Sequence, residues 1–376
     1  MFSAHTLLAV ALFTASALSA QTAVQAGSQA SPLRVAIVGL EHGHVDGFLS
    51  SLQHVSDVQL VGVSDPDPAL FAKYQKKFNL PASLPFFPDE STMIRTVHPQ
   101  AVLVYTSIAG HRPAIETAAQ FGVSVMVEKP LTISLEDALA IRSTAEAHHI
   151  QVLVNYETTW YPSNRAVYDE VRNNHLGPIR RILVNDGHQG PEEIGVPPEF
   201  LNALTDPEQN GAGAMYDFGC YGADLATWLM GGKAPLTVTA TANHDKPDRY
   251  PRVDDDATIV LQYPKAQAVI QASWNWPFGR KDMEVYGATG YAIAADKNHL
   301  RMRQEHDSSE QMHDVSWLPD SEKDSLTYLA AVLNGKITPR GDLTSLDTNI
   351  VVMQILDAAR ESVRTGKTIH LKNIPE

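Results

Sequence analysis

The sequence predicts an α/β protein in two parts. An N-terminal doubly wound parallel sheet is followed by an α+β domain built on a large, mostly antiparallel open sheet. From residue 33 to residue 155, short apolar runs alternate with helical segments, as in β-α-β units. After about Tyr156 the apolar runs lengthen and are joined by tight turns, which favours antiparallel pairing. The length of 376 residues allows each part a core of its own.

The first part, residues 32–155, has the order of a doubly wound sheet, in which a ligand lies at the carboxyl ends of the strands. Its alternation predicts strands at 33–39, 58–64, 101–106, 124–128 and 151–155, and helices at 45–54, 69–78, 111–121 and 134–149.

The second part, residues 156–376, is predicted to contain six strands and three helices, and two of these helices end the chain. Its pattern predicts strands at 180–185, 236–242, 257–263, 267–276, 283–287 and 291–296, and helices at 214–230, 325–333 and 346–365.

Residues 1–26 have the pattern of a secretory signal peptide. A short apolar core at 7–13 is followed by small residues, with cleavage points after Ala20 or Ala26. The core is too short to span a membrane as a mature helix. The leader contains no Lys or Arg, and therefore no twin arginine for exporting a folded enzyme with its cofactor. We expect a periplasmic or secreted protein whose mature chain does not insert into a membrane.

Charge and cysteine content exclude several classes of partner and site. A formal net charge of −14 argues against binding to nucleic acid or to an anionic membrane surface. The single cysteine, Cys220, excludes an internal disulfide framework and a Cys-rich metal site. A small-molecule substrate remains the expected partner.

Residues 38–44, VGLEHGH, almost form a dinucleotide-binding loop after the first strand. The G-x-G-x-x-G pattern needs Gly for the turn, for the approach of the pyrophosphate and for helix packing. Gly39 keeps the first position, whereas Glu41 and His44 occupy the second and third. We expect cofactor binding to be retained but weaker, with Glu41 turned away and the N–H groups of the helix N-terminus still facing phosphate. The predicted cofactor contacts in this loop are Gly39, Leu40, His42, Gly43 and His44.

Asp65 ends the second predicted strand in the sequence VSDPD, about 20 residues after His44, as expected for the carboxylate that binds an adenosine ribose. Asp67 adds negative charge that repels a 2′-phosphate. NAD is therefore favoured over NADP, and an Asx-Pro turn without a ligand is the alternative.

Lys129, in the sequence Glu-Lys-Pro at the end of the fourth strand, is predicted to reach the crevice at the strand ends, because a residue before proline is extended. Its ammonium can bind a substrate hydroxyl or lower the pKa of a neighbouring acid. A solvated turn is the alternative.

Residues 211–224, GAGAMYDFGCYGAD, are a Gly-rich start to an apolar helix. If the helix has begun by then, Asp217, Tyr221 and Asp224 recur at i, i+4 and i+7 on one face. Such a polar stripe needs partners or a cavity, and a buried capping network is the alternative to a catalytic face.

Five motifs together resemble the glucose-fructose oxidoreductase, inositol dehydrogenase and rhizopine-catabolism family, usually called Gfo/Idh/MocA. The resemblance covers nearly all of the chain after residue 31. It implies a Rossmann-type NAD(P)-binding domain over 32–155 and a domain for substrate and oligomerisation over 156–376. The motifs are the first-strand loop, TSIAGH at 106–111, VMVEKP at 125–130, the block GAGAMYDFGCYGADLATWLMG at 211–231 and ILDAARESVRTGKTIHL at 355–371.

The resemblance also implies roles for residues. Lys129 would lie beside nicotinamide and substrate, and Asp217 would match the substrate-site aspartate. Tyr221 stands where many members carry His, as in the branch in which a tyrosine is the acid/base. The Lys129 ammonium would favour the ionised phenol, so that Tyr221 takes the hydroxyl proton while Lys129 steadies the developing oxyanion. Thr106, His111 and Glu128 complete the implied cofactor-binding set.

The predicted substrate contacts are Tyr156, Trp160, His188, Asp217 and Tyr221. Trp160 stands where relatives carry an aromatic residue and Thr159 where many carry Arg, which favours a neutral, stackable ring such as a pyranose. For His188, an exposed loop histidine is the alternative. Glu41, His42 and His44 carry metal-ligating groups, but histidines two apart would point to divergent faces of a helix, so we expect no metal site.

The sequence thus predicts an exported NAD(P)-dependent oxidoreductase that acts on a sugar or cyclitol hydroxyl or carbonyl. Because free nicotinamide cofactors are scarce outside the cytoplasm, we expect the cofactor to stay bound and to be recycled in place. A homo-oligomer is expected from the family. Two alternatives remain open: a redox-neutral NAD-dependent glycosidase of the same family, and a non-catalytic protein that binds a sugar or dinucleotide.

Overall fold

The structure is a computed structural model that describes residues 31–52 and 54–374, and the predicted signal peptide lies outside this range. Among the described helices, none combines the length and the apolar composition that a membrane span requires.

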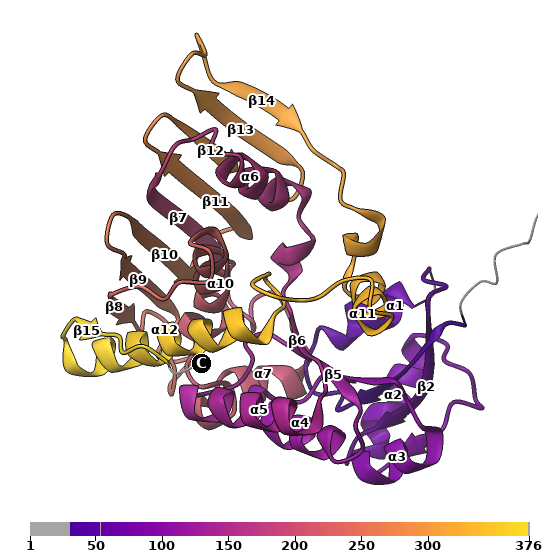
Figure 1. The fold of residues 1–376 in the computed structure, drawn as a ribbon. Coiled ribbons are helices and arrows are strands. Elements are labelled where there is room, and N and C mark those ends of the chain that lie inside the picture. The colour runs from indigo at the N-terminus through magenta and orange to yellow at the C-terminus, as the bar shows by residue number, and fades with distance from the viewer. Residues whose placement is uncertain (1–30, 53, 375–376) are drawn as a thin grey trace, which may run out of the picture. The chain divides into compact units, whose positions relative to one another are not determined.

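The first part is a parallel sheet of six strands in the order β3-β2-β1-β4-β5-β6 (Figure 1). This order and the parallel pairing confirm the predicted doubly wound sheet. The strands are β1 Leu33–Val38, β2 Val58–Ser64, β3 Phe86–Phe87, β4 Ala101–Val104, β5 Ser124–Glu128 and β6 Val152–Asn155. The helices are α1 Val45–Ser51, α2 Pro68–Lys77, α3 Glu90–Val97, α4 His111–Ala119 and α5 Leu135–His148, with a 3-10 turn at Ile108–Gly110.

Both faces of this sheet are buried, which explains why its strands are almost wholly apolar. In β1, Ala36 and Val38 belong to the core shared with α3, α4 and α5. Val35 and Ile37 belong to a second core, shared with α1 and α2. Because successive side chains of a strand point to opposite faces, most residues of such a strand are apolar, and the exposed Arg34 is the exception in β1.

The second part contains a sheet of nine described strands in the order β14-β13-β12-β11-β7-β10-β9-β8-β15. Only the β7–β10 pairing is parallel, so the predicted mostly antiparallel sheet is confirmed. The strands are β7 Ile179–Gly187, β8 Thr237–Asn243, β9 Asp256–Gln262, β10 Gln267–Ser273, β11 Arg280–Gly287, β12 Gly290–Ala294, β13 His299–Gln304, β14 Gln311–Asp314 and β15 Ile369–His370.

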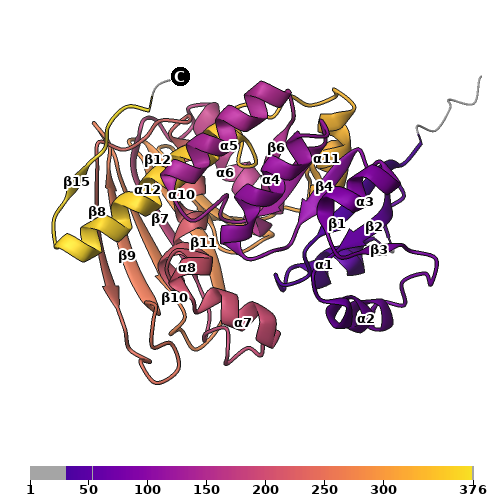
Figure 2. The ribbon, with the colours of Figure 1, turned by 90° about the horizontal axis from the view of Figure 1, so that it is seen from below.

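Helices of the second part pack on one face of this sheet and between the two sheets (Figure 2). Helix α12 crosses β8, and α10 crosses β7 and β10. The helices are α6 Pro162–Arg172, α7 Pro198–Leu204, α8 Pro207–Asn210, α9 Ala214–Asp217, α10 Gly219–Leu229, α11 Ser325–Leu333 and α12 Leu346–Thr365, with 3-10 turns at Glu157–Trp160 and Asp320–Glu322.

Helix α11 returns to the N-terminal sheet, although it follows all the long strands of the second part. Leu326, Leu329 and Val332 join the core that contains Val35 and Ile37. The side chain of Asp324 accepts a hydrogen bond from the Thr327 N–H and so caps the helix. The C-terminal part therefore completes the covering of the first sheet.

The helix predicted at 214–230 is divided at Phe218 into α9 and α10. The start of α9 is held by Asp254, whose carboxylate accepts from the N–H groups of Gly213 at 2.9 Å and Met215 at 2.7 Å. The condition for the stripe, one continuous helix through Asp217, Tyr221 and Asp224, is therefore not met, although Asp217 and Tyr221 line the same cavity. Several elements were not predicted because they are short or polar, among them β3, α3, α6, α7, α8, β13, β14 and β15.

Candidate active site

A cavity of about 220 Å³ lies between the carboxyl ends of the parallel strands and the second part of the chain. The loop after β1 and the end of β5 supply one wall, and β7, α7, α10 and β11 supply the others. Its lining residues are Gly43, His44, Lys129, His188, Pro191, Ile194, Val196, Pro197, Phe200, Leu204, Asp217, Phe218, Tyr221 and Lys281. We call this cavity the main pocket.

A buried ion pair joins the two parts in the wall of the main pocket. Lys129 Nζ donates to Asp217 Oδ1 at 2.5 Å and to the Asp217 carbonyl oxygen at 3.0 Å. Trp274 Nε1 donates to Asp217 Oδ2 at 2.9 Å. Burial alone would raise the pKa of Asp217, but the Lys129 ammonium holds it below its usual value. Burial would likewise lower the pKa of Lys129, but the Asp217 carboxylate holds it above its usual value, so both groups are charged.

Tyr221 lies beside this pair, as predicted. The centre of its ring is 5.1 Å from Lys129 Nζ and 4.7 Å from Lys281 Nζ. Its pKa, however, is raised well above the usual value, first by burial and then by nearby anions such as Glu157. The predicted lowering by Lys129 is wrong because burial and the surrounding anions outweigh that ammonium.

His188 lines the main pocket, so it is not an exposed loop histidine. Its Nδ1 accepts from the Gly190 N–H at 2.9 Å, and its ring contacts Phe218 edge-on with centres 4.8 Å apart. Burial lowers the pKa of His188. In the neutral ring the proton is then on Nε2, which makes this nitrogen a donor.

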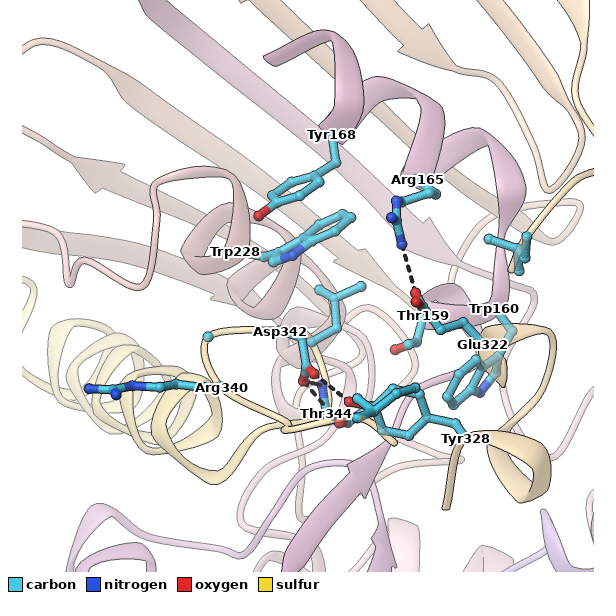
Figure 3. A pocket seen from close by; sticks show the side chains of 14 residues that line it. Thr159, Trp160, Arg165, Tyr168, Trp228, Glu322, Tyr328, Arg340, Asp342 and Thr344 are labelled. Atoms are coloured by element: carbon cyan, nitrogen blue, oxygen red, sulfur yellow. Dashed lines mark hydrogen bonds and ion pairs between the residues drawn. The ribbon is translucent and has the colours of Figure 1, made fainter. Parts of the chain in front are cut away.

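Two predicted substrate residues lie elsewhere. Tyr156 is fully buried behind Tyr221, with ring centres 5.5 Å apart, and its hydroxyl donates to Asn349 Oδ1 at 2.9 Å. Trp160 lines a second cavity of about 250 Å³ (Figure 3). The prediction that both contact the same ligand as Tyr221 is therefore wrong, because Tyr156 is buried away from the main pocket and Trp160 lines another cavity.

The polar groups of the second cavity are mostly satisfied within the protein. Arg165 Nη1 donates to Glu322 Oε2 at 2.7 Å, and the Tyr328 hydroxyl donates to Asp342 (Figure 3). Tyr168 and Trp228 stack with ring centres 3.8 Å apart. Among the other lining residues, the hydroxyl of Thr159 has no partner among the described residues.

The loop after β1 makes the sharp turn that its first glycine predicts. Gly39 has φ +79°, and a Cβ there would lie 2.6 Å from Thr106 Cγ2. Thr106 therefore lies directly against the loop, and its hydroxyl donates to the Ser107 carbonyl at 2.9 Å. Glycine at 39 is therefore required both by its backbone conformation and by space.

The rest of the loop is not an open phosphate cradle. The N–H of Leu40 donates to Asp65 Oδ2 at 2.7 Å, that of His42 to the Tyr105 carbonyl at 2.8 Å and that of Val45 to the His42 carbonyl at 3.1 Å. The turns at the start of α1 therefore use part of the N–H groups that were expected to face phosphate.

Acidic residues around the loop bind backbone groups. Glu41 accepts from the Ser107 N–H at 2.9 Å, and burial raises the pKa of its carboxyl. The two oxygens of Asp65 accept from Leu40 and Asp67, each at 2.7 Å, and burial raises the pKa of Asp65. Asp65 stands at the end of β2 as predicted, with its carboxylate turned to the loop.

His111 is completely buried at the start of α4 and does not line the main pocket. Its Nδ1 lies 3.2 Å from the Leu131 carbonyl, and Nε2 has no partner among the described residues. Burial lowers the pKa of His111 to about 4, so its ring is neutral.

His42, His44 and Glu128 converge at the edge of the main pocket. His44 Nδ1 lies 2.7 Å from Glu128 Oε2, and the rings of His42 and His44 meet edge-on with centres 4.6 Å apart. Glu128 Oε1 accepts from Asn155 at 2.8 Å. The argument against a metal site assumed a helix, but residues 42–44 precede α1, so the two rings converge instead of diverging.

Three residues of the site had no signal in the sequence. Lys281 of β11 reaches the Tyr221 ring and contacts the Glu157 carboxylate, Trp274 binds Asp217, and Phe200 of α7 packs on His42 with ring centres 4.2 Å apart. All three come from segments that the tertiary fold brings to the strand ends, with no motif of their own.

Two family models match the chain. Residues 33–156 match "Oxidoreductase family, NAD-binding Rossmann fold" and residues 164–293 match "GFO/IDH/MocA C-terminal domain". Among curated proteins, a dTDP-3,4-didehydro-2,6-dideoxy-alpha-D-glucose 3-reductase of Saccharopolyspora spinosa is 23% identical over 61% of this chain. The match spans 65% of that relative, less than two thirds of its length.

Two solved structures have the same fold. Aldose-aldose oxidoreductase from Caulobacter crescentus, complexed with glycerol, has a TM-score of 0.76 at 21% identity and covers 90% of this chain and 100% of its own. An inositol dehydrogenase homolog from Azotobacter vinelandii, complexed with NAD+, has a TM-score of 0.77 at 19% identity and covers 91% of this chain and 98% of its own.

Proposed function

The chain belongs to the Gfo/Idh/MocA family of oxidoreductases, and from this premise we propose that it is an NAD(P)-dependent oxidoreductase acting on a sugar or cyclitol hydroxyl or carbonyl. The observation that carries the proposal is the Lys129–Asp217 ion pair beside Tyr221 in the main pocket. An ammonium and a phenol at one pocket wall are suited to an oxygen atom whose charge changes during reaction.

The substrate class is supported by two of the similar proteins. One is named as a reductase of a deoxy-sugar nucleotide, and another as an aldose-aldose oxidoreductase. A pocket of about 220 Å³ lined by two lysines, three rings with hydrogen-bonding groups and Phe218 suits a small polyhydroxylated ring.

A nicotinamide cofactor, when bound, accepts or supplies a hydride. The protein's own residues control the protonation and the charge of the substrate oxygen. Because the pKa of Tyr221 is raised by burial, the phenol is protonated at neutral pH and donates a hydrogen bond or a proton to a carbonyl oxygen. Asp217 keeps Lys129 charged, so the ammonium stabilises negative charge on that oxygen. Tyr221 is thus in the form that carbonyl reduction requires of an acid.

The first part of the chain has the features of a dinucleotide-binding domain. Strand order, the turn at Gly39 and the carboxylate of Asp65 at the end of β2 support a cofactor across the loop after β1. The residues that would hold it are Gly39, Leu40, His42, Gly43, His44, Asp65, Thr106, Glu128 and Lys129. Because the N–H groups of Leu40 and His42 have protein partners and Phe200 covers His42, we expect the loop and α7 to rearrange when the cofactor binds.

NAD is proposed over NADP because Asp65 and Asp67 would repel a 2′-phosphate. The signal-like leader supports a periplasmic or secreted location, and there a cofactor that stays bound would be recycled by a second substrate. The open nine-stranded sheet supports a homo-oligomer.

The test is to denature purified protein, identify the released small molecules by absorbance and mass, and titrate the emptied protein with NAD(H) and NADP(H). Stoichiometric NAD(H), or binding of added NAD(H) with turnover of a sugar or cyclitol, is expected. Protein that holds no dinucleotide and binds neither cofactor would refute the proposal and favour a non-catalytic binding protein.

A further inference from the structure

We propose that His42, His44 and Glu128 bind a divalent transition-metal ion, with Zn²⁺ as the leading candidate, at the edge of the main pocket. This site goes beyond the proposed oxidoreductase activity and does not depend on it.

The three side chains meet the spacing that one ion requires. Each offers one ligand atom, and these atoms all lie within 4.8 Å of one another. Around an ion with bonds of about 2.0–2.2 Å, ligand atoms lie roughly 3–4 Å apart. The contact of 2.7 Å between His44 Nδ1 and Glu128 Oε2 shows that two of them already converge. Small movements of side chains are enough to surround an ion.

The backbone explains why histidines two residues apart can act together here. They lie in the turn between β1 and α1, where the Val45 N–H donates to the His42 carbonyl at 3.1 Å and closes the turn. Their rings meet at 74°. Glu128 is the last residue of β5, which belongs to the same sheet as β1. Glu41, the acid between the strand and the histidines, is instead held by the Ser107 N–H.

The site has the supporting contacts that metal ligands usually have. Glu128 Oε1 accepts from Asn155 Nδ2 at 2.8 Å, and Asn155 Oδ1 accepts from Trp160 Nε1 at 3.0 Å. These bonds fix the carboxylate so that Oε2 faces His44. Phe200 packs against the His42 ring and limits its rotation.

The donor set determines the class of ion. Two imidazole nitrogens and one carboxylate favour Zn²⁺ or another divalent first-row ion over Mg²⁺ and Ca²⁺, which prefer all-oxygen sites. Three protein ligands leave a coordination position open. Because His44 lines the main pocket together with Lys129 and Tyr221, an oxygen of water or of a polyhydroxylated substrate can occupy that position.

The test uses the full protein, purified without an affinity tag that binds metals, stripped with a chelator and titrated with Zn²⁺ and Co²⁺. We expect one ion per chain by calorimetry and elemental analysis, and a Co²⁺ absorption spectrum typical of nitrogen and oxygen ligands. His44→Asn and Glu128→Gln should each weaken binding by at least about 100-fold, and Asn155→Ala by about 10–100-fold.

The matched control is His175→Asn. His175 also contacts a glutamate, with Nδ1 2.9 Å from Glu170 Oε2, but on the surface. This variant should bind metal like the wild type. Zn²⁺ should raise the melting temperature of the wild type and of the control, but not of His44→Asn.

A stripped wild-type protein that takes up no ion at micromolar concentration would overturn the inference, as would unchanged binding in both His44→Asn and Glu128→Gln. If those two variants do not fold, the result for Asn155→Ala decides in their place. NAD(H) binding is measured on the same preparations. Because His42, His44 and Glu128 are also proposed cofactor contacts, Asn155→Ala, outside that set, distinguishes the two sites: it should weaken metal binding and leave NAD(H) binding unchanged.

Discussion

At the scale of single residues, Lys129, Asp217 and Tyr221 have distinct physical tasks. Lys129 carries the positive charge, Asp217 maintains it, and Tyr221 supplies a proton. The sequence predicts that these three residues lie at one site, but their protonation depends on their contacts in the folded protein. Lys129 stays charged beside Asp217, but burial and the neighbouring anions still raise the pKa of Tyr221.

Removing either group that faces the substrate should reduce turnover. We expect Lys129→Ala and Tyr221→Phe each to lower kcat by at least about 100-fold, as for loss of an oxyanion partner or a positioned acid. Steady-state kinetics on the substrate identified by screening would measure this. Near-normal rates in both variants would refute the assigned roles.

The ion pair also makes a testable contribution to stability. Lys129→Met leaves Asp217 buried without a counter-charge, so we expect a loss of about 3–5 kcal/mol in the free energy of unfolding at pH 7. The double variant Lys129→Met/Asp217→Leu should lose less, since no charge stays buried. Chemical denaturation compares the three proteins, and a double variant less stable than the single one would contradict this account.

The pH dependence of that stability has a definite sign. In the wild type the pKa of Asp217 is lowered, so its contribution is present above the unfolded pKa and is lost as pH falls through the folded value. Without Lys129, burial raises the pKa of Asp217, and the variant gains stability as pH falls. The difference in the free energy of unfolding between the wild type and Lys129→Met should therefore be smaller at pH 5 than at pH 7.

Tyr221 predicts opposite pH profiles for the two directions of reaction. Its pKa is raised by burial, so the phenol stays protonated across the neutral range. Reduction, which needs the acid, should be nearly flat from pH 6 to pH 8, whereas oxidation, which needs the phenolate, should rise with pH. A plateau of the oxidation rate below pH 8, retained in Tyr221→Phe, would assign the base to another group.

At the scale of elements, the loop after β1 and helix α7 decide whether a dinucleotide can bind. The loop departs from the pattern of three glycines, and the N–H groups of Leu40 and His42 are bonded within the protein. Helix α7 adds Phe200 over His42 and Gly43. The same elements bring His42 and His44 beside Glu128, so the departures that weaken a phosphate cradle also assemble the proposed metal site.

If α7 has to move to admit the cofactor, weakening its contact should help binding. We expect Phe200→Ala to tighten NAD(H) binding about 3–10-fold, because the unliganded state loses packing that the bound state does not have. Fluorescence titration would measure the affinity, with Phe278→Ala, at a position 78% exposed, as the control. Weaker binding in Phe200→Ala would mean that this ring contacts the cofactor instead.

At the scale of the whole molecule, α11 connects the two parts of the described chain, because it belongs to the second part and packs on the first sheet. Leu329 is completely buried in that core. Leu329→Ala should therefore cost about 2–5 kcal/mol of stability, whereas Leu236→Ala, at a position 52% exposed, should cost little. Denaturant titration followed by tryptophan fluorescence provides the comparison, and equal small losses would show that α11 contributes little to the core.

By itself, the sequence determined the two-sheet architecture and the family, because buried parallel strands and amphipathic helices impose periodicities that are visible in a linear chain. It also brought Lys129, Asp217 and Tyr221 to one site, through motifs at strand and helix ends. Only the tertiary structure decided which groups share a pocket, since Lys281, Trp274 and Phe200 arrive from segments without a motif, and Trp160 is directed to another cavity. The structure also decided protonation and the convergence of His42 with His44, because both depend on burial, neighbouring charge and turn geometry, which residue spacing does not encode.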